Sequence, residues 1–284
     1  MVTVNKEIVK ISYELSIGQY GGQLIYPSDW VLADLAKDMM SMPSEADLFT
    51  ETVGQHYPIG TQLRKNGKLY RYCKAGEAMT TVGFLKGNYF QCPGKAGNNG
   101  NSGYEAAAYA ALVADQTYVD ITDTAAAKNE YENAYGVVYD DTNNYFDDYT
   151  ILGNDASDGT FTRLYIAPPG IKTAKLAAKQ WTIYRNPYMG IRQKATCGSY
   201  GSALGWAKFP ITSAYYFWLQ TAGPISGLTG ASTWPGQTAH YRDVYSNTDG
   251  SLIGYTAGYQ RVGYLLSRTA SDYGDNFIML QLDQ

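Results

Sequence analysis

The segment between Pro210 and Pro224 constrains the fold of this chain more than any other stretch. Its central part carries four consecutive aromatic residues, followed by leucine, glutamine and threonine. Aromatic and β-branched residues favour the pleated surface of a sheet, and proline marks strand ends because it cannot donate a ladder hydrogen bond. The segment therefore predicts a strand that ends at the Gly223-Pro224 pair.

Side chains alternate between the two faces of a strand, and both faces of this one are bulky and largely apolar. One face carries Tyr216, Trp218 and Gln220, and the other carries Tyr215, Phe217 and Leu219. Such a strand has to be covered on both sides. We therefore predict a place in the core of a β domain, or at a contact between subunits, for Tyr215, Tyr216, Phe217, Trp218 and Gln220.

The pair Asn66-Gly67 is the strongest turn signal in the chain, since both central positions of a type I′ turn need a positive φ. It predicts a hairpin with strands at 59–64 and 68–74. Other alternating segments bounded by turn residues predict further strands, at 116–123, 135–140, 145–152, 160–168, 181–188, 250–255, 260–268 and 276–282. Closely spaced strands of this kind are typical of a mainly β fold, a sandwich or barrel-like β meander.

The first part of the chain, residues 1–56, differs from the rest. Ser28 is suited to cap a helix, and apolar residues from Trp30 to Met40 support one short N-terminal helix. We predict an N-terminal arm or helical segment over 1–56 and a β-rich core over 57–284. The core is either one body or two subdomains, 57–170 and 171–284. The arm either reaches a neighbouring subunit or covers one end of the core.

Charge and composition narrow the choice of partners. With 22 basic and 26 acidic residues the net charge is −4, and no basic tract is present, which argues against direct nucleic-acid binding. Only 17% of residues are charged while 27 are tyrosine, which suits a protein with much of its surface against other protein. A tyrosine-rich β core gives the same composition, so both interpretations stay open.

Three cysteines without paired spacing, Cys73, Cys92 and Cys197, predict reduced thiols in a protein made in a cytoplasm. The N-terminal residues carry no secretory signal pattern, and no apolar run is long enough to span a bilayer. We therefore expect no membrane partner.

The sequence predicts no catalytic, cofactor-binding or metal site. His56 and His240 stand far apart, and neither has a second ligand at short spacing. The glycines of 87–103 lack phosphate-binding spacing, and the serine of 201–205 is misplaced for a nucleophile elbow. Aspartates between 140 and 158 fit turns better than a calcium loop. A pair of glycosidase carboxylates among the 26 acids stays open.

Four segments, taken in order, resemble virion proteins of tailed bacteriophages, in particular capsid decoration proteins of environmental phages. They are 59–76 with its Tyr-Arg-Tyr, 126–154, the Tyr-Phe-Trp-Leu-Gln-Thr-Ala-Gly-Pro of 216–224, and 262–282. Together they cover roughly residues 59 to 284, and the Phe-Trp-x-Gln-Thr piece is the most specific. The chain departs from the pattern at Asn133-Ala134, where paired glycines are expected.

The resemblance implies a non-enzymatic structural protein located in the virion and made in the host cytoplasm. A decoration or cement protein binds the major capsid protein of the phage head and stabilises it, as a homo-oligomer and often as a trimer. Two alternatives remain: the major capsid shell protein itself, which would need a long helix, and a receptor- or glycan-binding module of a tail fibre or spike. An enzyme ranks below all three.

Overall fold

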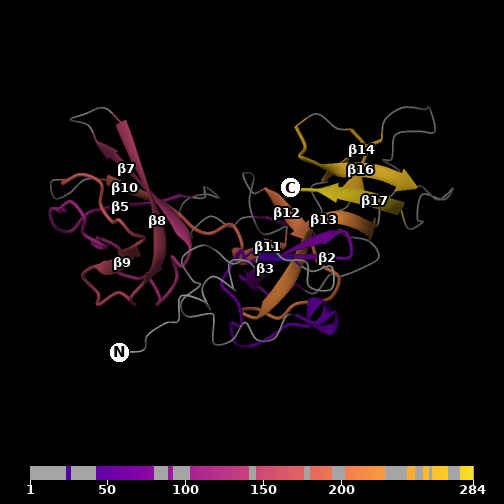
Figure 1. The fold of residues 1–284 in the computed structure, drawn as a ribbon, viewed down its shortest axis with the longest axis horizontal. Coiled ribbons are helices and arrows are strands. Elements are labelled where there is room, and N and C mark those ends of the chain that lie inside the picture. The colour runs from indigo at the N-terminus through magenta and orange to yellow at the C-terminus, as the bar shows by residue number, and fades with distance from the viewer. Residues whose placement is uncertain are drawn as a thin grey trace. The chain divides into compact units, whose positions relative to one another are not determined.

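The chain forms two compact units, and the second is an insertion in the sequence of the first (Figure 1). Unit 1 comprises residues 1–93 and 187–284, and unit 2 comprises residues 94–186. The computed structural model describes residues 24–26, 43–79, 89–91, 103–140, 145–175, 180–193, 202–227, 242–246, 252–255, 258–267 and 276–283.

The predicted mainly β fold class is confirmed, but the chain is divided differently from the predicted arm and core. The division at 170/171 does not coincide with a unit boundary, because the sheet of unit 1 pairs strands from both ends of the chain. The helix expected after Ser28 lies outside the described residues. The described helical segment is a short 3-10 turn, η1 (Ala46–Phe49).

Unit 1 contains an eleven-stranded sheet. Its strands are β1 (Leu24–Tyr26), β2 (Gln62–Lys65), β3 (Lys68–Ala75), β4 (Tyr89–Gln91), β11 (Met189–Gln193), β12 (Ala203–Trp206), β13 (Tyr216–Gly227), β14 (Asp243–Ser246), β15 (Leu252–Ile253), β16 (Arg261–Ser267) and β17 (Asn276–Gln281). β3 pairs with β11, β11 with β4, β4 with β12, β12 with β13, and β13 pairs with β3 again. These five strands therefore form a closed ring, from which β17, β16, β14 and β15 continue.

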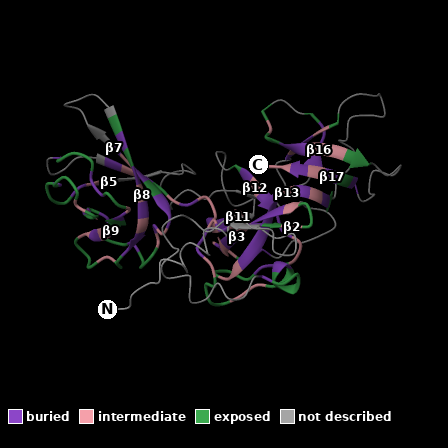
Figure 2. Cartoon of the chain, viewed as in Figure 1, coloured by how far each residue is buried: buried purple, intermediate pink, exposed green. Residues whose placement is uncertain are grey.

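The predicted aromatic strand is β13, and both of its faces are covered (Figure 2). On one face, Phe217 and Leu219 belong to a buried cluster that includes Cys73 and Ile191. On the other face, Trp218 belongs to a second cluster with side chains of β2 and β3. β13 therefore separates two hydrophobic clusters of the same chain.

The prediction that this strand ends at Gly223-Pro224 is wrong, since β13 continues to Gly227. It changes partner at Ala222, which faces Leu69 of β3 and Gln281 of β17. A proline is tolerated where a strand has one unpaired edge. From Gly223 onward, β17 is the one described strand that pairs with β13.

The predicted hairpin around Asn66-Gly67 is confirmed. β2 and β3 pair antiparallel across it, with Lys65 opposite Lys68. Asn66 and Gly67 have φ values of 51° and 72°, as a type I′ turn requires.

The described residues just before this hairpin cover unit 1 rather than extending from it. Thr52 forms an antiparallel bridge with Tyr216, and Leu48 of η1 is buried in the same cluster as Trp218. β1 pairs with β2. The parts of the expected N-terminal arm that the structure describes therefore pack on the core of their own chain.

Unit 2 contains a six-stranded antiparallel sheet in the order β5-β10-β7-β8-β9-β6. Its strands are β5 (Gly103–Ala107), β6 (Tyr118–Ile121), β7 (Ala134–Asp140), β8 (Tyr145–Asn154), β9 (Thr162–Ile166) and β10 (Gln180–Tyr184). A bridge between Ala108 and Ile121 joins the two outer strands, so the sheet curls back on itself. Trp181, Val138 and Ile151 point into a single core cluster.

A buried ion pair joins Lys175, which precedes β10, to Asp147 of β8. Lys175 Nζ lies 2.6 Å from Asp147 Oδ2, and the two side chains are 1% and 8% exposed. Lys175 also donates a hydrogen bond to Thr173 Oγ1 at 2.7 Å. A buried charge that loses its partner is strongly destabilising, so these groups depend on each other.

Removal of the lysine should therefore unfold unit 2 more easily. Lys175→Met is expected to lower the free energy of unfolding by about 3–5 kcal/mol, because Asp147 remains buried without its counter-charge. The double variant Lys175→Met/Asp147→Leu should recover most of this loss. Urea denaturation measures both. The control is Lys172→Met, which breaks an exposed pair with Asp148 at 3.4 Å and should cost about 0.5 kcal/mol or less. Equal losses in the two single variants would contradict the prediction.

A second stability prediction concerns Gly223, whose φ is 95°. A Cβ atom there would lie 2.5 Å from the carbonyl oxygen of Gly67 and 2.8 Å from Lys68 Cα. Gly223→Ala should lower the free energy of unfolding by about 3 kcal/mol or more, from strain and backbone overlap together. Gly258→Ala is the matched control, because Gly258 has a φ of 85° with no atom within 4 Å of the new Cβ. It should cost about 1 kcal/mol. If the two variants unfold alike, backbone contact at Gly223 is not the cause.

Candidate interaction surface

The structure places the residues predicted from the aromatic strand within unit 1. Phe217, Trp218 and Gln220 are buried, and Tyr215 and Tyr216 are half-buried. The Gln220 amide donates hydrogen bonds to the carbonyl oxygens of Ala222 and Pro224, at 3.1 and 3.2 Å. For the three buried residues, the cover on this strand comes from the chain itself.

Tyr216 and Trp218 belong to an aromatic cluster with Tyr57 and Tyr72. The ring centroid of Tyr72 lies 5.2 Å from that of Tyr57, 5.1 Å from that of Trp218 and 6.0 Å from that of Tyr216. The Tyr72 hydroxyl accepts a hydrogen bond from the backbone N–H of His56 at 3.1 Å. This cluster explains part of the high tyrosine content as core packing.

Burial raises the pKa of both Tyr57 and Tyr70 in this region to about 12, from the ordinary value of 10. For Tyr57 the negative charge of Asp47 adds to the effect of burial, and for Tyr70 that of Glu45 does. Ionisation in the folded state is therefore harder than in the unfolded chain. The resulting stability is fully present below pH 10 and is lost as the pH rises toward 12.

We accordingly expect the free energy of unfolding of unit 1 to fall as the pH rises above about 10. The variant Tyr57→Phe/Tyr70→Phe should show a shallower decline, because two groups that ionise preferentially in the unfolded state are gone. Urea denaturation at a series of pH values, with tyrosinate absorbance recorded in parallel, measures the effect. Tyr255→Phe removes an exposed tyrosine and should leave the slope unchanged. An unaltered slope in the double variant would exclude these two side chains as its source.

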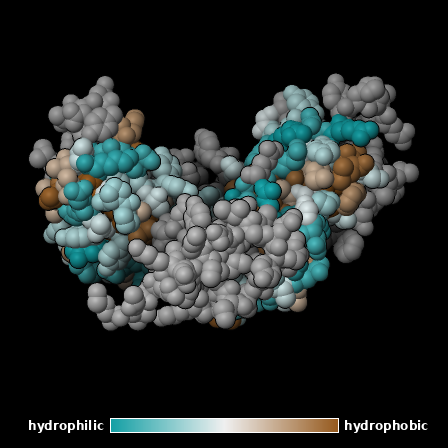
Figure 3. Space-filling view, in the orientation of Figure 1, coloured by the Kyte–Doolittle hydropathy of each residue, from teal (hydrophilic) through white to brown (hydrophobic). Residues whose placement is uncertain are grey.

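Exposed aromatic side chains are concentrated on unit 2 among the residues that the structure describes. They are Tyr109, Tyr118, Tyr135, Phe146, Tyr165 and Tyr184. In Figure 3, hydrophobic residues lie scattered among hydrophilic ones on the surface of this unit. None of these residues was predicted from the sequence to form a surface. Strand alternation could have placed Tyr135 on the outer face. Tyr135 and Val138 are three positions apart in one strand, so their side chains point to opposite faces, and Val138 is buried in the core.

Two neighbouring strands, β6 and β9, carry the best-defined group of these side chains. Their register sets Tyr118 opposite Tyr165 and Asp120 opposite Arg163. With Asp155 these four residues form a surface that we call the β6–β9 patch. Both tyrosines are 41% exposed.

Internal contacts hold the side chains of the β6–β9 patch in place. Arg163 donates two hydrogen bonds to the Asp120 carboxylate, at 2.8 and 2.9 Å, and its Cζ lies 4.4 Å from the centre of the Tyr118 ring. The Tyr165 hydroxyl donates to Asp155 Oδ2 at 2.7 Å. These two carboxylates raise the pKa of Arg163 and of Tyr165, in each case mainly through the hydrogen bond. Less side-chain entropy is lost when a partner binds such a surface.

The composition of the β6–β9 patch favours recognition over chemistry. Tyrosine and arginine are the side chains enriched where proteins bind each other, because they combine apolar area with directed hydrogen bonds. Within the described ranges no group of three or more His, Cys, Asp or Glu side chains could hold a metal ion. Cys73, the cysteine that is described, is a buried free thiol whose pKa is raised by burial.

Asp158, from the stretch considered for calcium, forms a local turn instead. Its Oδ1 accepts hydrogen bonds from the backbone N–H groups of Thr160 and Phe161, at 2.7 and 2.9 Å.

None of the described helical segments has the length and apolar character that a bilayer-spanning helix requires.

Comparisons with known protein families, with curated proteins and with solved structures found no match. The fold therefore defines the class of this chain at the level of architecture. It is a mainly β protein of two units, the second of which presents an ordered aromatic and charged patch.

Proposed function

We propose that the chain is a non-enzymatic structural protein of a tailed-phage virion, a decoration protein that binds the major capsid protein and acts as a homo-oligomer. The observation that carries the proposal is the β6–β9 patch, an outward surface of tyrosine and arginine held by its own hydrogen bonds. The resemblance of residues 59–284 to phage decoration proteins supplies the class of particle. On this proposal the protein is made in the host cytoplasm and is located in the virion.

The geometry of the β6–β9 patch suits a protein partner. A pair of strands with aromatic and charged side chains in cross-strand register offers a firm contact area. The Arg163 guanidinium already lies over one face of the Tyr118 ring, at 4.4 Å, so that face is not open to a sugar. A carboxylate or carbonyl group of a partner can still reach the remaining donors of the guanidinium, which has five N–H groups.

Copy number in purified particles tests the proposed role directly. Quantitative mass spectrometry of virions of the phage that encodes this chain should find on the order of hundreds of copies per particle, because symmetric coverage of a capsid lattice requires that many. A handful of copies would favour the alternative, a receptor- or glycan-binding tail module, which the exposed tyrosines would also suit. Absence from the virion would overturn the proposal.

The β6–β9 patch should be needed for attachment to the particle. Arg163→Ala/Tyr165→Ser is expected to weaken binding to virions stripped of this protein by about ten-fold or more, because anchor residues of an interface carry most of its affinity. Co-sedimentation measures the change, and thermal unfolding verifies the fold. Tyr135→Ser is the matched control, since it removes an exposed tyrosine from another strand. If all variants bind as the unaltered protein does, the patch is not the contact.

A further inference from the structure

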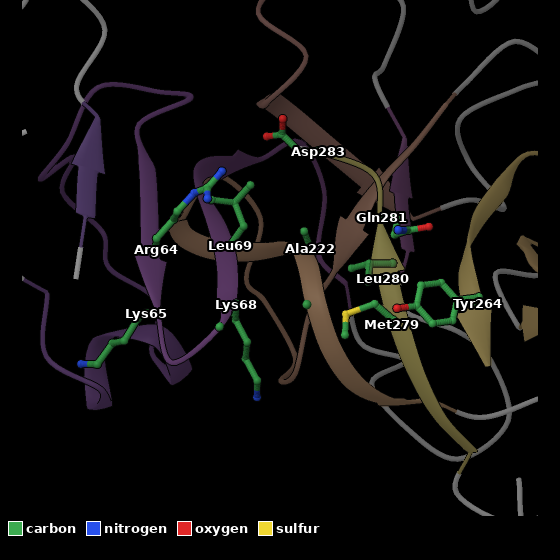
Figure 4. A pocket seen from close by; sticks show the side chains of 12 residues that line it. Arg64, Lys65, Lys68, Leu69, Ala222, Tyr264, Met279, Leu280, Gln281 and Asp283 are labelled. Atoms are coloured by element: carbon green, nitrogen blue, oxygen red, sulfur yellow. The ribbon is translucent and has the colours of Figure 1, made fainter. Parts of the chain in front are cut away.

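Unit 1 contains an open groove of about 610 Å³ where the β2–β3 hairpin meets β17 (Figure 4). The groove lies where β13 changes its partner strand. Ala222 pairs with Leu69 of β3 and with Gln281 of β17. This site lies outside the β6–β9 patch, and the proposed function does not use it.

Positive charge dominates the groove. Arg64, Lys65 and Lys68 line it, all from the β2–β3 hairpin, and none of them forms an ion pair with a described residue. The single lining carboxylate, Asp283, already accepts a hydrogen bond from Arg71 Nε at 2.5 Å. Three cations therefore line a space with no free counter-charge among the described residues.

The positive charge at the hairpin also affects the pKa of a neighbouring lysine. Lys208 has its pKa lowered to about 8, first by burial and then by the positive charge of Lys68. Its Nζ lies 5.0 Å from the centre of the Phe49 ring. Clustered like charges repel one another, so an anionic partner in the groove would relieve an unfavourable interaction.

The rest of the lining is partly apolar, with Gln281 and two glycines beside the apolar residues. Ala222 and Met279 are half-buried, Leu69 and Leu280 are only 4% and 2% exposed, and Tyr264 lies beside Met279 (Figure 4). An inorganic anion would leave most of the groove and its apolar side chains uncovered. A ligand that matches the whole lining carries carboxylates on one side and apolar groups on the other, and is large enough for a space of about 610 Å³.

We propose that the groove binds an acidic polypeptide segment of a partner protein, one that alternates carboxylate and apolar side chains. The carboxylates face Arg64 and the two lysines of the hairpin. The apolar side chains contact Met279 and Tyr264, which are half-buried. In an extended segment, alternate side chains point in opposite directions, so one row can reach the cations of the hairpin while the other reaches Met279 and Tyr264.

The test uses the full-length protein and a fluorescently labelled hexapeptide of alternating glutamate and leucine. Fluorescence anisotropy should show saturable binding that weakens as sodium chloride rises from about 50 to about 300 mM, since exposed charge pairs are screened. Arg64→Gln/Lys68→Gln should weaken this binding by about ten-fold, the combined loss of two solvent-accessible charge contacts. A hexapeptide of alternating glutamine and leucine should bind more weakly than the acidic probe.

Arg242→Gln is the matched control, because Arg242 is an exposed cation of unit 1 outside the groove. It should bind the acidic peptide as the unaltered protein does. Thermal unfolding verifies that the groove variant is folded, and the single variant Arg64→Gln, at an exposed position, provides a second reading. No saturable binding at about 1 mM peptide, equal binding of the glutamine peptide, or competition by inorganic phosphate alone would each overturn the proposal. None of these outcomes bears on attachment through the β6–β9 patch.

Discussion

The burial of β13 on both faces is the constraint on which unit 1 depends. Phe217 and Leu219 fill one hydrophobic cluster, and Trp218 fills another with Tyr70 and Tyr72. Because successive side chains of a strand point in opposite directions, neither cluster can form without the other. The same strand pairs with β3, β12 and β17, so the closed ring and its extension are held by one segment.

The groove lies where β13 passes from one partner strand to the next. Gly223 takes a φ of 95°, and its missing Cβ lets the hairpin turn approach within 2.5 Å of where that atom would stand. The approach sets the cationic hairpin beside Met279 and Leu280 of β17. The close approach that the fold requires at Gly223 thus also places the residues that line the groove.

Local chemistry made several elements predictable from sequence. Asn66-Gly67 identified its hairpin because few residues accept a positive φ, and the alternating runs at 135–140 and 145–152 identified β7 and β8. The unit boundaries could not be predicted, because they depend on the parallel pairing of Met189 with Lys74, which leaves no local signature. Nor could the β6–β9 patch, since its residues meet only through strand register.

The high tyrosine content had two interpretations from sequence, core packing and an interaction surface. The chain has tyrosines of both kinds. In unit 1, Tyr70 and Tyr72 are buried, and burial raises the pKa of each hydroxyl. In unit 2, the side chains of Tyr118 and Tyr165 are exposed on the surface of the sheet, and a charged neighbour orients each of them. A count of tyrosines therefore overstates the surface available to partners. What marks a binding surface is exposure combined with fixed orientation, because a partner then gains contact area without the entropic cost of ordering the side chains.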